Sequence, residues 1–232
     1  MLAKMDQKFG CENCEFRKMS SLYVDGDSFD EFRQQSVKLS FAKGETIFKQ
    51  GSKSGGLLFL HEGIVKFCYQ YDSGNNYIMT IVRGPKLLGG ANLFFKSVNI
   101  FSITAMEDSQ VCMLDSSAFM KLAVGNPAYL LALVENTMDM FQNAIFNFIS
   151  LAHNHVNGRI ATILLYLHKN VYNRPGFSFT VSRKEIAEFA ACSHENVINT
   201  LSRFRKEGII EFHGKEIEIL NFELLEEISR KG

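Results

Sequence analysis

The chain has 232 residues, 25 basic and 25 acidic side chains, 46% hydrophobic residues and only 3 prolines. This length suits one large domain or two small ones, and the composition excludes a disordered or collagen-like chain. No apolar run reaches the roughly 18 residues of a membrane-spanning helix. The first ten residues lack the apolar core of a signal peptide. We therefore expect a cytoplasmic protein with no membrane segment.

Residues 37–115 are predicted to form short strands, because glycines interrupt them at the spacing of all-β proteins. Apolar and polar side chains alternate over residues 64–71, which is strand periodicity. Residues 72–75 have the composition of a turn, and residues 76–82 form the returning strand. The pattern predicts a compact β-roll.

A long helix is predicted after the Asn-Pro pair at 126–127, which is typical of a helix start. Apolar residues then recur at alternating spacings of four and three, in a seam that includes Val134, Thr137, Phe141 and Phe148. A second apolar stripe lies beside this seam, so the helix needs two partners. One partner can be the β-roll. The other is most simply a second copy of the helix in a two-fold dimer, although a core helix in a monomer is an alternative.

A helix-turn-helix is predicted after a polar hinge at 153–158. Ser182 and Glu185 have the spacing of a capping box at the start of a short helix. After a turn, Ser193 caps a second helix with an apolar face, and residues 209–219 are typical of a two-stranded wing. This combination places the second helix in the major groove of DNA.

The polar face of the second predicted helix suits base recognition. The carboxylate of Glu195 can accept a hydrogen bond from cytosine, and the amide of Asn199 can bond adenine. Residues 151–215 hold nine basic residues against five acidic ones, so Arg183, Arg203 and Lys215 are expected to contact phosphates. The alternative is a packing motif whose polar face only meets water.

The sequence does not predict an enzyme, because it contains no nucleophile–base constellation, phosphate loop or complete metal set. Its five cysteines include Cys11 and Cys14 in a C-x-x-C spacing, which is used for metal, iron–sulfur or redox chemistry. Structural disulfides are not expected in a chain without a secretion signal.

Several segments resemble the CRP/FNR superfamily of bacterial transcription regulators. The C-terminal resemblance lies in residues 158–167, 182–186, 192–197 and 213–215, and the upstream resemblance in residues 44–45, 51, 62–63 and 88–94. It implies an α+β fold of three parts. These are an N-terminal segment and cyclic-nucleotide-binding-like β-roll, or jelly roll (1–125), a long dimerisation helix with a hinge (126–157), and a winged helix-turn-helix (158–232).

The resemblance implies a homodimeric, sequence-specific DNA-binding regulator, controlled by an unidentified effector or redox signal in the β-roll. Its partners would be a palindromic operator in double-stranded DNA, a second copy of the chain, and RNA polymerase. Base readout is expected from Glu195, Asn199 and His194. Contacts with the DNA backbone are expected from Ser182, Arg183, Ser193, Asn196, Arg203 and Lys215. Because Asn199 replaces a family arginine, the half-site should lack a guanine that this arginine would read.

The effector pocket departs from the cyclic-AMP-binding branch of the superfamily. The expected pocket residues are Gly89, Gly90, Ala91, Asn99 and Ile100. Gly90 replaces the glutamate that binds ribose in that branch, while Asn99 and Ile100 replace its arginine–serine pair. Since a phosphate needs a compensating charge, cyclic AMP is disfavoured and the effector stays unknown.

The cysteines partly match the iron–sulfur branch of the superfamily. Cys11, Cys14 and Cys112 fall at three of its four ligand positions, and Ser20 stands at the fourth. A [4Fe–4S] cluster normally takes four thiolates. The resemblance therefore leaves open an iron–sulfur cluster with another ligand. It also leaves an alternative function, an iron–sulfur or redox-sensing module whose DNA contact is secondary.

Overall fold

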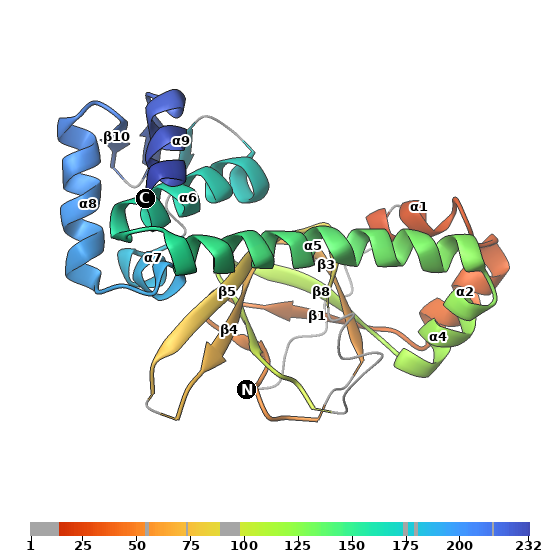
Figure 1. The fold of residues 1–232 in the computed structure, drawn as a ribbon. Coiled ribbons are helices and arrows are strands. Elements are labelled where there is room, and N and C mark those ends of the chain that lie inside the picture. Colours follow the sequence, from red (N-terminus) through yellow and green to blue (C-terminus); the bar gives the residue numbers. More distant parts are fainter. Residues whose placement is uncertain are drawn as a thin grey trace. The chain divides into compact units, whose positions relative to one another are not determined.

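The computed structural model describes residues 14–53, 56–72, 74–88, 98–173, 176–178, 181–214 and 216–232. The chain divides into two compact units (Figure 1). The first contains residues 1–65 and 83–141, and the second contains residues 66–82 and 142–232.

Two four-stranded sheets form the predicted β-roll, and the strands predicted over residues 64–71 and 76–82 are both present. One sheet has the order β1-β8-β3-β6 and the other has the order β2-β7-β4-β5. The strands of the first are antiparallel: β1 (Val37–Phe41), β3 (Leu57–Glu62), β6 (Lys86–Leu88) and β8 (Ser109–Leu114). Those of the second are β2 (Thr46–Phe48), β4 (Ile64–Gln70), β5 (Asn76–Arg83) and β7 (Ser102–Ala105).

Among the described residues of the first unit, three short helices were not predicted from the sequence. They are α1 (Glu15–Ser20), α2 (Gly26–Gln34) and α4 (Ser116–Val124). Asp25 and Asp115 cap α2 and α4 by accepting hydrogen bonds from backbone amides. The core beneath these helices is strongly aromatic and includes Phe16, Phe29, Phe32, Phe59, Phe119 and Tyr129. Five of the chain's 21 phenylalanines lie in this core.

The predicted long helix is present as α5 (Pro127–His153), which runs unbroken for 27 residues. Tyr129 in its first turn is buried, and Leu130 and Leu133 pack against the aromatic core. Many other apolar side chains of α5 are exposed: Leu131, Val134, Met138, Phe141, Ile145, Phe146, Phe148 and Ile149. Within the described ranges, no single helix is both long and apolar enough to cross a membrane.

The C-terminal part of the second unit contains a helix-turn-helix and a small sheet. Its helices are α6 (Val156–Tyr166), the π-helix η1 (Leu167–Tyr172), α7 (Arg183–Ala190), α8 (His194–Lys206) and α9 (Phe222–Lys231). The predicted two-stranded wing is present as β10 (Ile210–His213) and β11 (Glu216–Ile219). A third strand, β9 (Gly176–Ser178), completes the sheet order β10-β11-β9.

The break between α5 and α6 lies within the predicted hinge at 153–158 but does not extend to Gly158. It falls at Asn154 and His155, whereas Gly158 is buried inside α6. A Cβ atom at Gly158 would lie 2.7 Å from the Cα atom of Gly232. The glycine therefore permits close packing with the end of α9, which corrects its assignment to the hinge.

Candidate nucleic-acid interface and sensory residues

The helix-turn-helix is held by two capped helix starts. The Ser182 hydroxyl accepts a hydrogen bond from the amide of Glu185 (3.2 Å), while the Glu185 carboxylate accepts one from the amide of Ser182 (2.7 Å). Ala191 adopts a left-handed conformation (φ 47°) in the turn. Ser193 then caps α8 by accepting a hydrogen bond from the amide of Asn196 (3.1 Å). The predicted capping box is confirmed.

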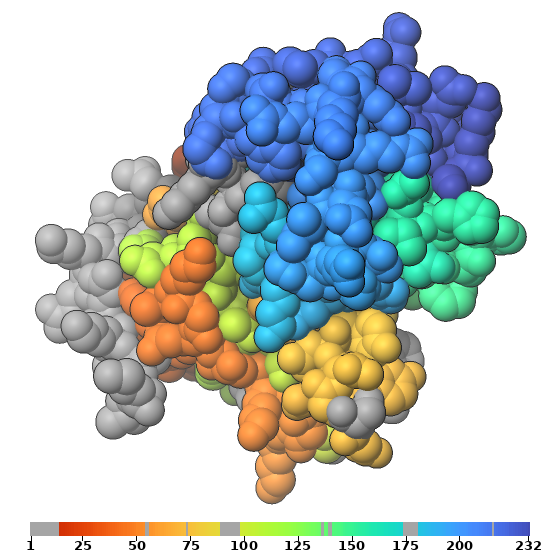
Figure 2. Space-filling model, turned by 90° about the vertical axis from the view of Figure 1, so that its left-hand side faces the viewer, coloured from red at the N-terminus to blue at the C-terminus, as the bar shows by residue number. Residues whose placement is uncertain are grey.

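The second helix, α8, separates a buried apolar face from an exposed polar one. Val197, Leu201 and Phe204 are at most 2% exposed and fix the helix on its core. The side chains predicted to read bases, His194, Glu195 and Asn199, are all exposed. The atoms of α8 form part of the surface shown in Figure 2. The spacing of these residues places them on a face that can enter a groove.

The expected phosphate contacts have different surroundings. Ser182, Arg183, Ser193 and Asn196 are exposed, and Lys215 lies outside the described residues. The guanidinium of Arg203 pairs with Glu207 at 2.9 Å, with both side chains near half exposed. Because such surface pairs contribute at most about 1 kcal/mol, a phosphate can replace the carboxylate at little cost.

A contact that sequence reasoning missed joins β4 to α7. The ammonium of Lys66 donates a hydrogen bond to Glu185 Oε1 at 2.7 Å, and the two side chains are only 17% and 19% exposed. Burial by itself would raise the pKa of Glu185, but hydrogen bonds from Lys66 and Ser182 outweigh it and lower this pKa. The carboxylate that caps α7 is therefore also tied to a strand. A separation of 119 positions hides this pairing in the sequence.

The predicted effector pocket supplies no positive charge for a phosphate at its described residues. Gly89, Gly90 and Ala91 lie outside these residues. Asn99 is 2% exposed, and its side-chain amide donates to the Ser52 hydroxyl (3.0 Å) and the Lys53 carbonyl (3.4 Å). The amide of Asn99 thus joins two segments of the chain, and neither Asn99 nor Ile100 supplies a positive charge.

Two of the three predicted metal ligands lie near each other. Cys14 and Cys112 line the same small cavity of about 20 Å³, whereas Cys11 lies outside the described residues. His61 also lines this cavity, and burial, assisted by the charge of Lys38, lowers its pKa to about 4. In the part of the chain that the structure describes, no three His, Cys, Asp or Glu side chains are grouped to hold a metal ion.

The side chains expected at the dimer interface are on the exposed surface of α5. Val134, Phe141 and Phe148 are 44%, 57% and 70% exposed. The hydroxyl of Thr137 donates to the Leu133 carbonyl at 2.8 Å, so this residue can lie in an apolar interface without leaving an unsatisfied hydrogen-bond donor. A contiguous apolar surface of this kind is typical of an interaction site.

Family comparisons match both halves of the chain. Residues 38–126 match the cyclic nucleotide-binding domain, and residues 158–228 match the Crp-like helix-turn-helix domain. Together these matches cover most of the chain, in the order that the sequence predicts.

Relatives with assigned functions are also similar along much of their length. The transcriptional activator protein Anr of Pseudomonas aeruginosa is 26% identical over 91% of this chain and 88% of its own. The cAMP-activated global transcriptional regulator CRP of Pasteurella multocida is 28% identical over 75% of this chain and 85% of its own. The structure of FixK2 from Bradyrhizobium japonicum has a TM-score of 0.76 at 20% identity, covering 83% of this chain and 96% of that one.

Proposed function

Because the chain belongs to the CRP/FNR superfamily of DNA-binding transcription regulators, we propose that it acts as a homodimer on a palindromic operator. Two copies of α8 would enter successive major grooves on one side of the DNA. The observation that supports this most strongly is the polar face of α8, where Glu195 and Asn199 are exposed above a buried apolar face. RNA polymerase is the expected protein partner.

The proposed dimer forms through the exposed apolar surface of α5. Two copies of this helix would bury Val134, Phe141 and Phe148 against each other, as the heptad spacing requires. A two-fold axis along this surface makes the two DNA-binding parts symmetric, and a palindromic operator matches that symmetry.

The proposed regulatory signal is an effector other than cyclic AMP, acting on the N-terminal domain. The structural use of Asn99 argues against a cyclic phosphate at this position. Both Anr and CRP are similar to this chain, but only CRP is named as activated by cAMP. Similarity to these relatives therefore does not identify the effector. Addition of cyclic AMP should leave the thermal unfolding midpoint and DNA affinity unchanged.

Substitution of Glu195 by Ala tests the proposed DNA readout. Preferred duplexes would first be selected from a random pool, and their affinities measured by fluorescence anisotropy against a scrambled duplex. We expect Glu195→Ala to weaken binding to the selected duplex by about 10–100-fold, because one good base contact contributes about 1–3 kcal/mol of discrimination. Binding to the scrambled duplex should change little.

Glu226→Ala removes a carboxylate from another exposed position, in α9, and is the matched control. It should leave the preference for the selected duplex unchanged. If Glu195→Ala keeps the wild-type preference, Glu195 does not read bases. If the wild-type chain selects no duplex, the alternative of a redox-sensing module with secondary DNA contact is favoured.

A further inference from the structure

The short helix α1 is anchored in the aromatic core of the first unit. Phe16 is 4% exposed, and its ring centroid lies 4.8 Å from that of Phe59 and 5.6 Å from that of Phe29. Phe59 belongs to β3 and Phe29 to α2. One side chain of α1 therefore joins the sheet to the second helix.

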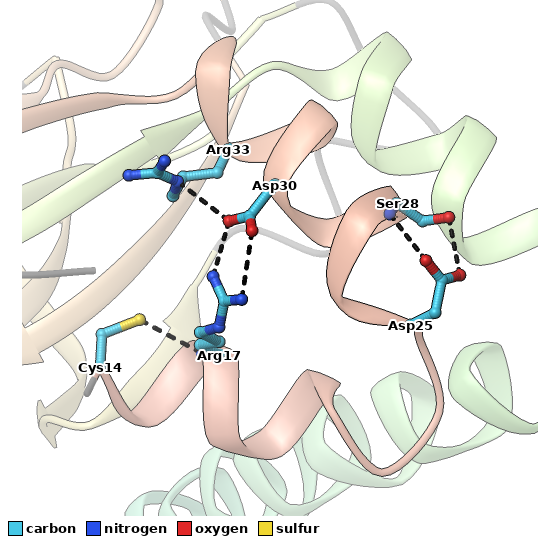
Figure 3. Close-up of polar contacts among 6 residues, drawn as sticks. All are labelled: Cys14, Arg17, Asp25, Ser28, Asp30 and Arg33. Carbon is cyan, nitrogen blue, oxygen red and sulfur yellow. Dashed lines mark hydrogen bonds and ion pairs between the residues drawn. The ribbon is translucent and has the colours of Figure 1, made fainter. Parts of the chain in front are cut away.

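Polar contacts also fasten α1 to α2 (Figure 3). The guanidinium of Arg17 donates two hydrogen bonds to the Asp30 carboxylate, at 2.6 and 3.2 Å. The same guanidinium lies over the ring of Phe29, 5.4 Å from its centroid. Arg33 also pairs with Asp30 at 3.4 Å. A bidentate pair of this kind fixes the relative orientation of two short helices.

The other end of α1 is bonded to the first turn of α5. Ser20 is fully buried, and its hydroxyl lies 2.9 Å from the hydroxyl of Tyr129, which is 3% exposed. Beside this bond, the Asn126 side-chain amide donates to the Tyr23 carbonyl, and the Tyr129 amide donates to Asn126 Oδ1. The start of the long helix is thus held by the segment that follows α1.

These contacts bear on the iron–sulfur cluster that the superfamily resemblance leaves open. Cys14 accepts a hydrogen bond from the Arg17 amide, and it shares with Cys112 a cavity of about 20 Å³. Such a space accommodates about one water molecule, whereas a [4Fe–4S] cluster adds eight heavy atoms. Ser20, at the remaining ligand position, does not line this cavity and is bonded to Tyr129. The described residues do not fit a four-ligand cluster.

We infer that α1 and α2 form a structural clamp on the first turn of α5, fastened by the Ser20–Tyr129 hydrogen bond, in place of a [4Fe–4S] site. Tyr129 and Ser20 are then positioning residues for the long helix. This inference concerns a single chain, so it does not depend on the proposed dimer or operator.

The first experiment measures iron and acid-labile sulfide in the full chain. The protein is purified without oxygen and then incubated with ferrous ions, sulfide and a thiol reductant. We expect no stoichiometric cluster and no visible absorption band that bleaches in air, both for the wild type and for Ser20→Cys. A cluster of about four irons per chain that disappears in Cys14→Ala would overturn the inference. A cluster gained in Ser20→Cys would show that position 20 faces the cysteines, and would equally overturn it.

The second experiment is a double-mutant cycle on the clamp. Ser20→Ala and Tyr129→Phe should each lower the unfolding midpoint by about 2–4 °C, and the double variant should be no worse than the poorer single variant. Amide exchange should accelerate in the first turn of α5 but not in α8. Ser117→Ala, at an exposed serine of α4, is the matched control and should change neither quantity. Fully additive effects, or unchanged exchange in α5, would contradict the role of this bond.

Discussion

The helix-turn-helix and the sensory domain differ in how far they follow the resemblance. In α7 and α8, the cap residues, the buried face and the exposed polar face all lie where the sequence predicts them. In the sensory domain, the residues at the family's ligand positions have other partners. Asn99 bonds to Ser52 and Lys53, and Ser20 bonds to Tyr129.

The difference agrees with the general rule that a fold does not by itself determine which ligand it binds. A recognition helix can still bind DNA when one periodic face stays polar and exposed, even if its side chains read different bases. A phosphate or cluster site needs several groups that converge with the correct charge. When these groups form structural hydrogen bonds, the domain can keep its shape and lose that ligand.

The largest effect is expected for Phe141→Glu, which tests whether the exposed apolar surface of α5 forms the dimer interface. A carboxylate buried in an apolar interface without a partner costs several kcal/mol. We therefore expect the dimer dissociation constant to rise about 100-fold or more, which corresponds to about 2.7 kcal/mol. Analytical ultracentrifugation measures this change, and affinity for a palindromic duplex should fall with it.

Gln142→Glu introduces the same charge at the adjacent exposed position, outside the apolar seam. It should leave the dimer intact. A Phe141→Glu variant that still sediments as a dimer would place the interface elsewhere.

The sequence predicted the elements whose pattern is local. The capping box at Ser182, the apolar face of α8 and the unbroken α5 each depend on residues within a few turns of one another. It did not predict α1, α2 or the strand β9, because such short elements contain too few residues for a periodic signal. The Lys66–Glu185 pair was also missed, since only the folded chain brings these residues together.

The second prediction concerns Asn99→Leu, which tests whether this residue is structural. Leucine has a similar volume but leaves the Ser52 hydroxyl and the Lys53 carbonyl without the amide donor. We expect a loss of about 1–3 kcal/mol in the free energy of unfolding, measured by urea denaturation. Asn76→Leu, at an exposed position of β5, should cost much less. If Asn99→Leu is as stable as the wild type, the hydrogen bonds of Asn99 are not needed for folding, and Asn99 stays a candidate effector contact.

A smaller effect is expected for Lys66→Met, which removes the cation but keeps most of the side chain's length. Glu185, whose side chain is only 19% exposed, would lose its ammonium partner, and this penalty weakens the start of α7. We expect amides of α7 to exchange about 3–10-fold faster, a change of roughly 1 kcal/mol, as measured by mass spectrometry. Lys169→Met removes the same charge from an exposed site and should not alter α7. Equal exchange in both variants would show that the ion pair does not stabilise this helix.

The smallest expected effect is the pH dependence of folding stability that His61 contributes in the N-terminal domain. Burial lowers the pKa of His61 to about 4 from an ordinary value of 6.5, so between these values the unfolded chain binds a proton that the folded chain does not. Stability contributed by neutral His61 is therefore complete above about pH 6.5 and is lost as the pH falls toward 4. His61→Gln should reduce the difference in unfolding midpoint between pH 7 and pH 5 by about 2 °C or less, because the histidine is partly accessible to solvent. His153→Gln, at an exposed position of α5, should leave that difference unchanged. His61 lines the same cavity as Cys14 and Cys112. If the wild-type midpoint falls by more than this between pH 7 and pH 5, and His61→Gln does not reduce the fall, His61 is not the acid-sensitive group.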